Sequence, residues 1–142
     1  NLNVIFRKTK FINNPIATSD LFKLKANILT YIVESLRRSN KKRELIINLI
    51  NQQVPLYVWG IGREFLYLYS TLGMDKCHII GFIDGNRYKQ KNFTINGKKI
   101  SDNSILINSN KKSALIITAM AYKNQIKSQL VDIDYKGQII NL

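Results

Sequence analysis

The sequence predicts an α/β domain with a mostly parallel sheet covered on both faces by helices, preceded by one or two N-terminal helices. Two observations carry this prediction: short apolar runs follow one another from residue 54 onward, and amphipathic stretches separate them. The chain has 142 residues, 45% of them hydrophobic, which suffices for one domain with a sizeable core. Right-handed crossovers would bring the carboxyl ends of all parallel strands to one edge.

The first 53 residues are predicted to be a tail followed by a helical segment. We interpret residues 1–18 as the tail, with NVIFRK as a short strand left from a preceding domain. The polar stretch SNKK should break or bend the helical segment of residues 19–53, so that residues 43–53 form a second helix. The first helix would be capped by Ser19 or Asp20, and its apolar positions recur at helical spacing: Leu21, Leu24, Ile28, Ile32 and Leu36.

The remaining residues, 54–142, form the predicted sheet domain. Continuous apolar character predicts buried strands at LYVWG, HIIGFID and SALIITA, and GQIINL is expected to be the last strand. The pair Asn96–Gly97 predicts a hairpin turn inside an otherwise polar, turn-rich stretch. The segment SDNSILIN should form one helical turn capped by Ser101.

Two helices are expected between these strands. Residues 63–72 place apolar side chains on one face, and Gly73 is suited to the C-terminal cap. Residues 120–131 should form the other helix, with Ile126 and Leu130 facing inward.

Composition limits the classes of function. A single cysteine, Cys77, excludes an internal disulfide, and with the single histidine, His78, it does not supply the four ligands of a structural zinc. The start of the chain has neither a signal-peptide layout nor an initiator methionine, so we expect a cytoplasmic protein represented by a fragment. The apolar runs are too short for a membrane span.

The charge of +13 favours nucleic-acid binding less than it first suggests. Lysine, asparagine and isoleucine dominate the composition, as an AT-rich coding sequence would produce, and the dense basic run RRSNKKR is short. If residues 19–53 were built to face a missing domain, Leu24, Ile28 and Ile32 should be partly exposed, and such a patch favours a homodimer.

The turn GIGREF after the first buried strand is the first candidate binding site. Glycine at a strand-to-helix turn lets the backbone approach a ligand, and the following helix directs free N–H groups at a phosphate. Gly60 and Gly62 match the first two glycines of the G-x-G-x-x-G fingerprint, but Phe65 replaces the third and argues against a standard NAD site. Arg63 in the first helical turn is either a phosphate ligand or a solvent-facing arginine.

Two further segments should reach the same edge of the sheet. Asp84 ends the second buried strand, 22 residues after Gly62, so it either contacts a ribose or sugar hydroxyl or begins the turn DGN. Thr118 follows the third strand. Tyr88 and Tyr122 either stack on a base or sugar or cap the sheet edge. His78 starts its strand at the opposite edge, so no catalytic set is expected.

Four segments together resemble the C-terminal Rossmann-like domain of sugar C-methyltransferases: YVWGIGREFLYL, IIGFIDGNRYKQ, TINGKKI and IITAMAYKNQIKSQL. Those enzymes carry a Y-G-A-G-like turn, a V-D-x-N-x-x-K-Q-G-like strand end, an I-x-G-x-x-V hairpin and a Y-x-x-E-I helix start. The resemblance covers about residues 43–142. Nucleotide-binding modules of some sugar acetyltransferases share the D-x-N-x-x-K and I-x-G-x-x-V patterns.

The resemblance implies a Rossmann-like three-layer fold that holds a nucleotide diphosphate sugar in bacterial carbohydrate biosynthesis. In that family a central domain binds S-adenosylmethionine and an N-terminal module binds zinc. We therefore expect no cofactor or metal here, and a missing N-terminal catalytic domain as partner. Carried over by motif, the implied binding residues are Gly60, Ile61, Gly62, Asp84, Asn86, Lys89 and Tyr122.

Four functions remain open from the sequence. The first is a nucleotide-sugar binding domain that is not catalytic alone and belongs to a methyltransferase or another sugar-modifying enzyme. The second is a module for NAD or coenzyme A, and the third is an interaction domain whose pocket has decayed. The fourth is electrostatic binding to nucleic acid, which strong salt dependence would reveal.

Overall fold

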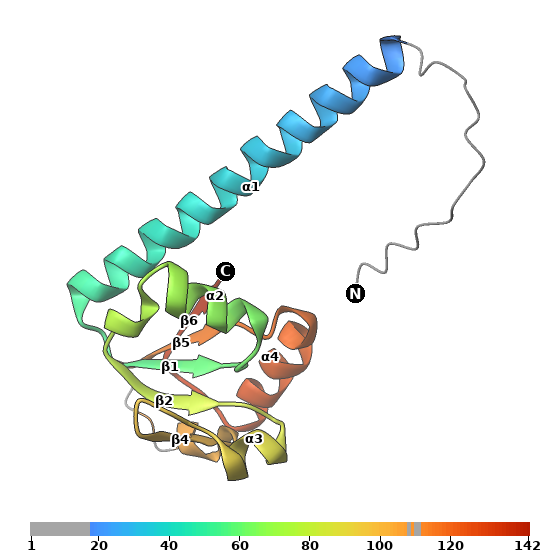
Figure 1. Cartoon of the computed structure of the whole chain (residues 1–142). Helices are drawn as coiled ribbons and strands as arrows, with labels where there is room; N and C mark the ends of the chain where they lie inside the picture. Colours follow the sequence, from blue (N-terminus) through green and yellow to red (C-terminus); the bar gives the residue numbers. More distant parts are fainter. Residues whose placement is uncertain (1–17, 108, 110–111) are drawn as a thin grey trace. The chain divides into compact units, whose positions relative to one another are not determined.

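The computed structural model describes residues 18–107, 109 and 112–142 (Figure 1). Internal contacts divide the chain into two units, Asn1–Arg37 and Arg38–Leu142. The predicted tail, including its NVIFRK strand, lies outside the described residues up to residue 17. In the described part of the chain, no helix is both long and apolar enough to cross a membrane.

One helix, α1 (Thr18–Gln52), replaces the two predicted ones. The predicted break at SNKK is wrong, because that stretch contains neither glycine nor proline and its side chains bond to helix α2 (Arg63–Thr71). Lys42 Nζ donates to Glu64 Oε1 at 2.5 Å, and the Ser39 and Tyr67 hydroxyls lie 2.6 Å apart. The helix ends where Gln53 takes a left-handed φ of 50°, two residues before Pro55.

In the first unit, the apolar positions of α1 are exposed. Leu24, Ile28 and Ile32 are 54%, 49% and 45% exposed, which confirms the expected exposed patch. The homodimer that such a patch favours stays a prediction.

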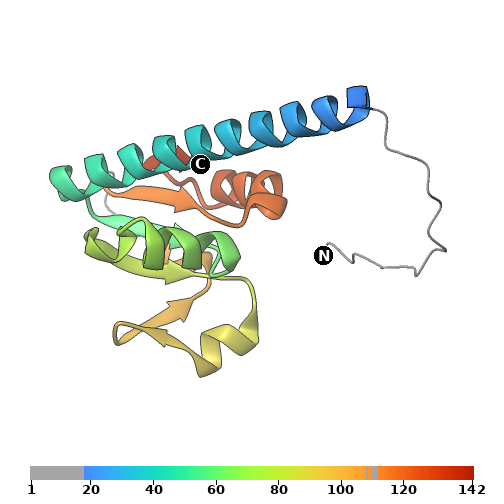
Figure 2. The same cartoon turned by 45° about the horizontal axis from the view of Figure 1, so that its top comes forward.

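Six strands form one mostly parallel sheet in the order β3-β4-β2-β1-β5-β6. The parallel strands are β1 (Leu56–Trp59), β2 (Ile79–Ile83), β4 (Lys98–Ser101), β5 (Ala114–Ile117) and β6 (Gln138–Asn141). The short strand β3 (Thr94–Ile95) runs antiparallel to β4. All four predicted strands are confirmed (Figure 2). The predicted hairpin turn is confirmed too, since Asn96 and Gly97 take the positive φ angles, 48° and 75°, of a type I′ turn.

The helices of the second unit are α2, α3 (Arg87–Asn92) and α4 (Lys123–Asp132). Three short 3₁₀ turns accompany them, at Met74–Lys76, Asn103–Leu106 and Met120–Tyr122. Gly73 follows α2 with the left-handed φ of 83° that its predicted cap role requires. The residues after β5 begin as a 3₁₀ turn, so the helix predicted from residue 120 starts at Lys123.

Two details of this region were predicted wrongly or not at all. The cap of the 3₁₀ turn is Asp102 rather than Ser101, because Ser101 belongs to β4 and the Asp102 carboxylate accepts from the Ser104 amide at 2.9 Å. Helix α3 was not predicted, because its sequence RYKQKN carries no apolar periodicity. The Asn86 side chain starts it by accepting from the Tyr88 amide at 2.9 Å.

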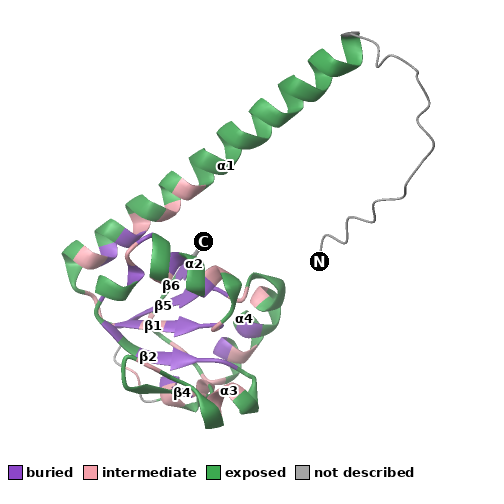
Figure 3. Cartoon of the chain, in the orientation of Figure 1, coloured by how far each residue is buried: buried purple, intermediate pink, exposed green. Residues whose placement is uncertain are grey.

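Buried side chains form two clusters, and adjacent residues of β1 contribute to different ones. In Figure 3, β1 and β2 are coloured mostly as buried. Val58 packs with Phe65 of α2 and with Ile46 near the end of α1. Trp59 packs with the inward residues of α4, Ile126 and Leu130. Successive side chains of a strand point to opposite faces, so the two clusters mark the two sides of the sheet. The prediction for Ile126 and Leu130 is confirmed.

Cys77 provides a test of this packing. Burial, assisted by the negative charge of Asp75, raises the pKa of the Cys77 thiol to about 11. At pH 8 only about one thiol in a thousand is then the reactive thiolate, against roughly a quarter for an unperturbed cysteine. We expect alkylation by iodoacetamide, followed by mass spectrometry, to be at least about 100-fold slower in the folded protein than in urea. The rate should rise with pH up to about 11. Equal rates in both states would contradict the buried position.

Candidate functional site

A cavity of about 790 Å³ lies at the carboxyl end of the parallel strands. The chain runs from β1 to β2 on one side and later crosses to β5 on the other, so the strand order reverses between β1 and β5. Ligands of open α/β sheets bind in the crevice at this reversal. Eight of the ten predicted site residues line the cavity: Gly60, Gly62, Arg63, Asp84, Asn86, Lys89, Thr118 and Tyr122. Ile61 and Tyr88 do not line it.

Gly60 forms a tight corner against the end of β5. Its φ is +108°, which disfavours any residue with a side chain, and an added Cβ would lie 2.5 Å from the Ala119 amide nitrogen. The Thr118 hydroxyl donates to the Gly60 carbonyl at 2.5 Å, and the Gly60 amide donates to Ile83 at 2.8 Å. Gly60 is therefore required by backbone packing, whatever the cavity binds.

Gly62 has a different environment. Its φ of −133° is open to any residue, and an added Cβ would meet no atom within 4 Å. Gly62 also lines the cavity, so its backbone is a position that a ligand there could approach. Gly60 is thus required by the structure, whereas Gly62 is a candidate binding position.

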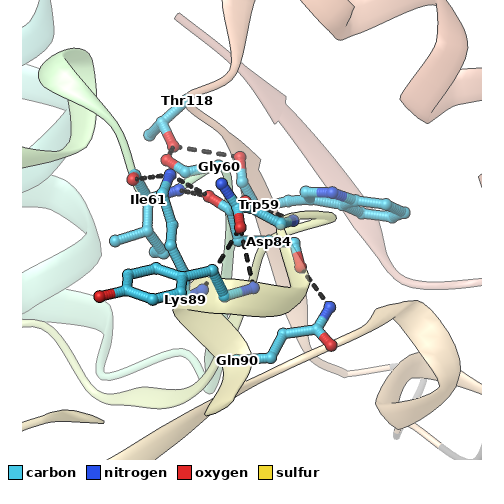
Figure 4. A network of polar contacts seen from close by, with 9 residues as sticks. Trp59, Gly60, Ile61, Asp84, Lys89, Gln90 and Thr118 are labelled. Carbon is cyan, nitrogen blue, oxygen red and sulfur yellow. Dashed lines mark hydrogen bonds and ion pairs between the residues drawn. The ribbon is translucent and has the colours of Figure 1, made fainter. Parts of the chain in front are cut away.

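The Asp84 side chain forms hydrogen bonds with two separate turns at the cavity (Figure 4). Its Oδ2 accepts from the Ile61 amide at 2.8 Å and from Lys89 Nζ at 2.8 Å, while Oδ1 accepts from the Asn86 amide at 2.9 Å. A carboxylate has about four acceptor positions, so at most one remains for a ligand. Asp84 is only 8% exposed. Its predicted alternative role, turn formation, is therefore present in the structure, and a sugar or ribose contact has at most one acceptor position left.

Lys89 reaches the same turn from α3. Besides the ion pair with Asp84, its Nζ donates to the Ile61 carbonyl at 2.5 Å. Both the amide and the carbonyl of Ile61 are thus bound by side chains from the β2–α3 segment. Lys89 is therefore a support of the turn, and the Ile61 side chain packs against the core cluster that contains Phe65 rather than lining the cavity.

Two backbone amides of the turn already have hydrogen-bond acceptors within the protein. The Ile61 amide donates to Asp84 and the Gly62 amide donates to the Gly60 carbonyl at 3.0 Å. Neither of these two amides is therefore free to donate to a phosphate. The first turn of α2, beginning at Arg63, still carries N–H groups without intrahelical partners.

The charges around the cavity leave one cation uncompensated. Glu64 pairs with Lys42, and Asp84 pairs with Lys89. Within the described ranges, the Arg63 guanidinium has no ion-pair or hydrogen-bond partner. It also lies at the N-terminus of α2, where the helix dipole favours an anion.

A model of the family described as C2185-like, N-terminal matches residues 52–140, more than half of the chain. The chain belongs to this family. Comparisons with curated proteins and with solved structures found no match. The C2185-like region contains both glycines of the turn, the Asp84–Lys89 segment and the end of β5, so the whole cavity lies inside it.

Sequence reasoning missed one wall of the cavity in this C2185-like domain. Gln125 and Gln129 of α4 line it, together with Met120. A signal was available, since each glutamine directly precedes an inward-facing residue, Ile126 or Leu130, of a helix that follows the third strand. Tyr88, by contrast, is 67% exposed and its ring lies 5.9 Å from that of Phe93.

The remaining reactive groups lie away from the cavity. His78 Nδ1 lies 3.3 Å from the Gln53 carbonyl oxygen, and neither residue lines the cavity. Among the residues that the structure describes, no three histidine, cysteine or acidic side chains are grouped so that they could hold a metal ion.

The two glycines can be tested as a matched pair. Gly60→Ala combines an unfavourable φ with a backbone clash, so we expect it to lower the free energy of unfolding by about 2 kcal/mol or more. Gly62→Ala should change it by less than about 1 kcal/mol, because the position is extended and open. Urea denaturation of both variants measures the difference. Similar losses for both would contradict the distinct roles of the two glycines.

The Asp84–Lys89 pair should stabilise the turn cooperatively. Asp84→Ala removes the acceptor of three donors, so we expect a loss of about 2 kcal/mol in the free energy of unfolding. Lys89→Met should cost less, since its side chain is 30% exposed. A double-mutant cycle should give a coupling energy of about 1 kcal/mol. Strictly additive losses would show that the pair does not act as a unit.

Proposed function

We propose that the C2185-like domain is a Rossmann-like, three-layer domain that binds a nucleotide diphosphate sugar in the cavity between β1 and β5. The position of this cavity, at the reversal of strand order beside the first turn of α2, is the observation that carries the proposal. Its volume of about 790 Å³ lies in the usual range of small-molecule sites. The resemblance to the substrate-holding domain of sugar C-methyltransferases supports the same ligand class.

The diphosphate would lie against Arg63 and the first turn of α2. A guanidinium offers paired donors that match phosphate geometry, and the helix N-terminus adds free amides. Lys42 neutralises Glu64, which would otherwise repel the anion from this end of the helix. Gly62 leaves the backbone open to close approach.

The nucleoside would lie beside the end of β5. Tyr122 is 64% exposed and Met120 is 44% exposed, yet both line the cavity. An exposed aromatic ring and a flexible thioether offer apolar surface on which a base can stack.

Phe65 disfavours the alternative, a dinucleotide such as NAD. The third glycine of the dinucleotide fingerprint permits close packing of helix on strand. Here Phe65 is 1% exposed and its ring lies 5.7 Å from that of Phe82 on β2. A large ring therefore separates α2 from the sheet where a dinucleotide site needs close packing.

We further propose that a parent enzyme supplies the chemistry, as a sugar methyltransferase whose separate domain binds S-adenosylmethionine. The cavity walls of the described chain offer no evident nucleophile or acid–base pair, because their carboxylates are held by lysines. The resemblance is to a C-terminal domain, whereas the family is described as N-terminal. In either order this domain would hold substrate and another would react with it.

Thermal unfolding against a ligand panel tests the proposal. We expect uridine or thymidine diphosphate sugars to raise Tm by several degrees at about 100 times Kd, the equivalent of about 2.7 kcal/mol. NAD, coenzyme A, S-adenosylmethionine and a short DNA duplex should not. Arg63→Gln and Gly62→Val should each weaken binding about tenfold or more.

Arg43→Gln is the matched control for Arg63→Gln. It removes the same charge from an exposed position of α1 that does not line the cavity. A panel with no response to diphosphate sugars, or equal effects of the two arginine variants, would refute the proposal. A response to NAD or coenzyme A alone would favour the alternative module.

A further inference from the structure

A second, smaller cavity of about 190 Å³ adjoins the first on the side of β2. The two share wall residues Trp59, Asp84, Gly85 and Gln129. The smaller cavity adds residues from α3 and from the 3₁₀ turn after β4, namely Arg87, Gln90, Asp102 and Asn103. A ligand in the large cavity could therefore extend past Asp84 and Gly85 without leaving the domain.

The walls of the small cavity carry planar polar groups with unused capacity. Asn103 Nδ2 donates to Gln129 Oε1 at 3.3 Å, which leaves the Asn103 oxygen and the Gln129 nitrogen available. Gln90 Nε2 donates to the Asp84 carbonyl at 2.7 Å, which leaves its oxygen available. In the part of the chain described by the structure, the Arg87 guanidinium has no partner.

The charge of the small cavity is balanced. It contains one cation, Arg87, and the Asp102 carboxylate, besides the paired Asp84. Hydrogen bonds from the Ser104 hydroxyl and amide lower the pKa of Asp102, which keeps it an ionised acceptor at neutral pH. Such a set of donors and acceptors suits a neutral group that can do both, as sugar hydroxyls do, better than a phosphate.

We propose that the small cavity is a subsite for the hexose ring of the nucleotide diphosphate sugar. This inference rests on the proposed function and adds the part of the ligand that this subsite recognises. Its volume accommodates several water molecules, and hence one six-membered ring. Asn103, Gln129 and Arg87 would bond to the ring hydroxyls, and the buried Trp59 indole, which extends away from the Asp84 carboxylate in Figure 4, forms an apolar wall. The diphosphate and nucleoside stay in the large cavity.

Calorimetric titrations with matched ligands test the subsite. The probes are uridine diphosphate and uridine diphosphate glucose, and the corresponding thymidine pair. We expect the sugar-bearing member of one pair to bind about tenfold tighter than the free diphosphate. Asn103→Leu and Arg87→Leu, which alter residues of the small cavity alone, should remove this advantage and leave the affinity for the free diphosphate unchanged.

Asn124→Leu is the matched control for Asn103→Leu, because Asn124 is exposed on α4 and lines neither cavity. It should keep the full tenfold advantage. If the free diphosphate binds and the sugar adds nothing, or if the small-cavity variants weaken both ligands equally, the subsite is refuted and the proposed function stands. If no diphosphate binds, both fail. Urea denaturation of each variant distinguishes lost recognition from lost folding, and Arg87→Leu changes an exposed side chain that folding tolerates.

Discussion

The Asp84 carboxylate is the interaction on which the cavity depends. It ends β2 and accepts donors from two segments that are distant in sequence, the Gly60 turn and the start of α3. Three donors on a carboxylate that is 8% exposed offset the cost of taking it out of water. Without these bonds the Ile61 amide would be left without a partner. The carboxylate therefore holds the Gly60 turn and the start of α3 together, and with them one wall of the cavity.

The opposite wall is fixed by backbone contact. Gly60 lies so close to Ala119 that no side chain fits between them, and the Thr118 hydroxyl holds the Gly60 carbonyl. The turn is thus held by hydrogen bonds to Asp84 on the β2 side and to Thr118 on the β5 side. Both constraints act before any ligand binds, so the cavity is preorganised. The two glycines of the GIG turn therefore have different roles. The first makes the tight corner, and the second leaves the cavity open.

Most of this arrangement can be predicted from the sequence, because local patterns determine it. Continuous apolar runs located the strands, and the edge shared by the three candidate segments followed from parallel topology. The failures have physical causes. SNKK stays helical because tertiary bonds from Ser39 and Lys42 hold it on α2, which no local pattern reveals. Helix α3 has no apolar face and depends on the Asn86 cap. The hydrogen bond between Asp84 and Ile61 joins residues that are 23 apart in the sequence. The sequence spacing of Asp84 alone does not distinguish turn formation from ligand binding.

The same contacts give several residues of the segment DGNRYK structural roles in place of the binding roles expected from the sequence. Asp84 and Lys89 bond to each other and to the Gly60 turn, and Asn86 caps α3, so these residues of the motif mainly build the walls of the site. Under the proposed function, recognition then falls on Arg87 within the motif and on neighbours outside it. Arg63 faces the large cavity with an uncompensated charge, while Asn103 and Gln129 present spare amide groups to the small one. Under the proposed function, a domain with these walls could keep its fold and exchange its ligand through changes at these recognition residues. Under the proposed function, ligand identity would therefore be set by these recognition residues rather than by Asp84, Asn86 and Lys89, which build the walls.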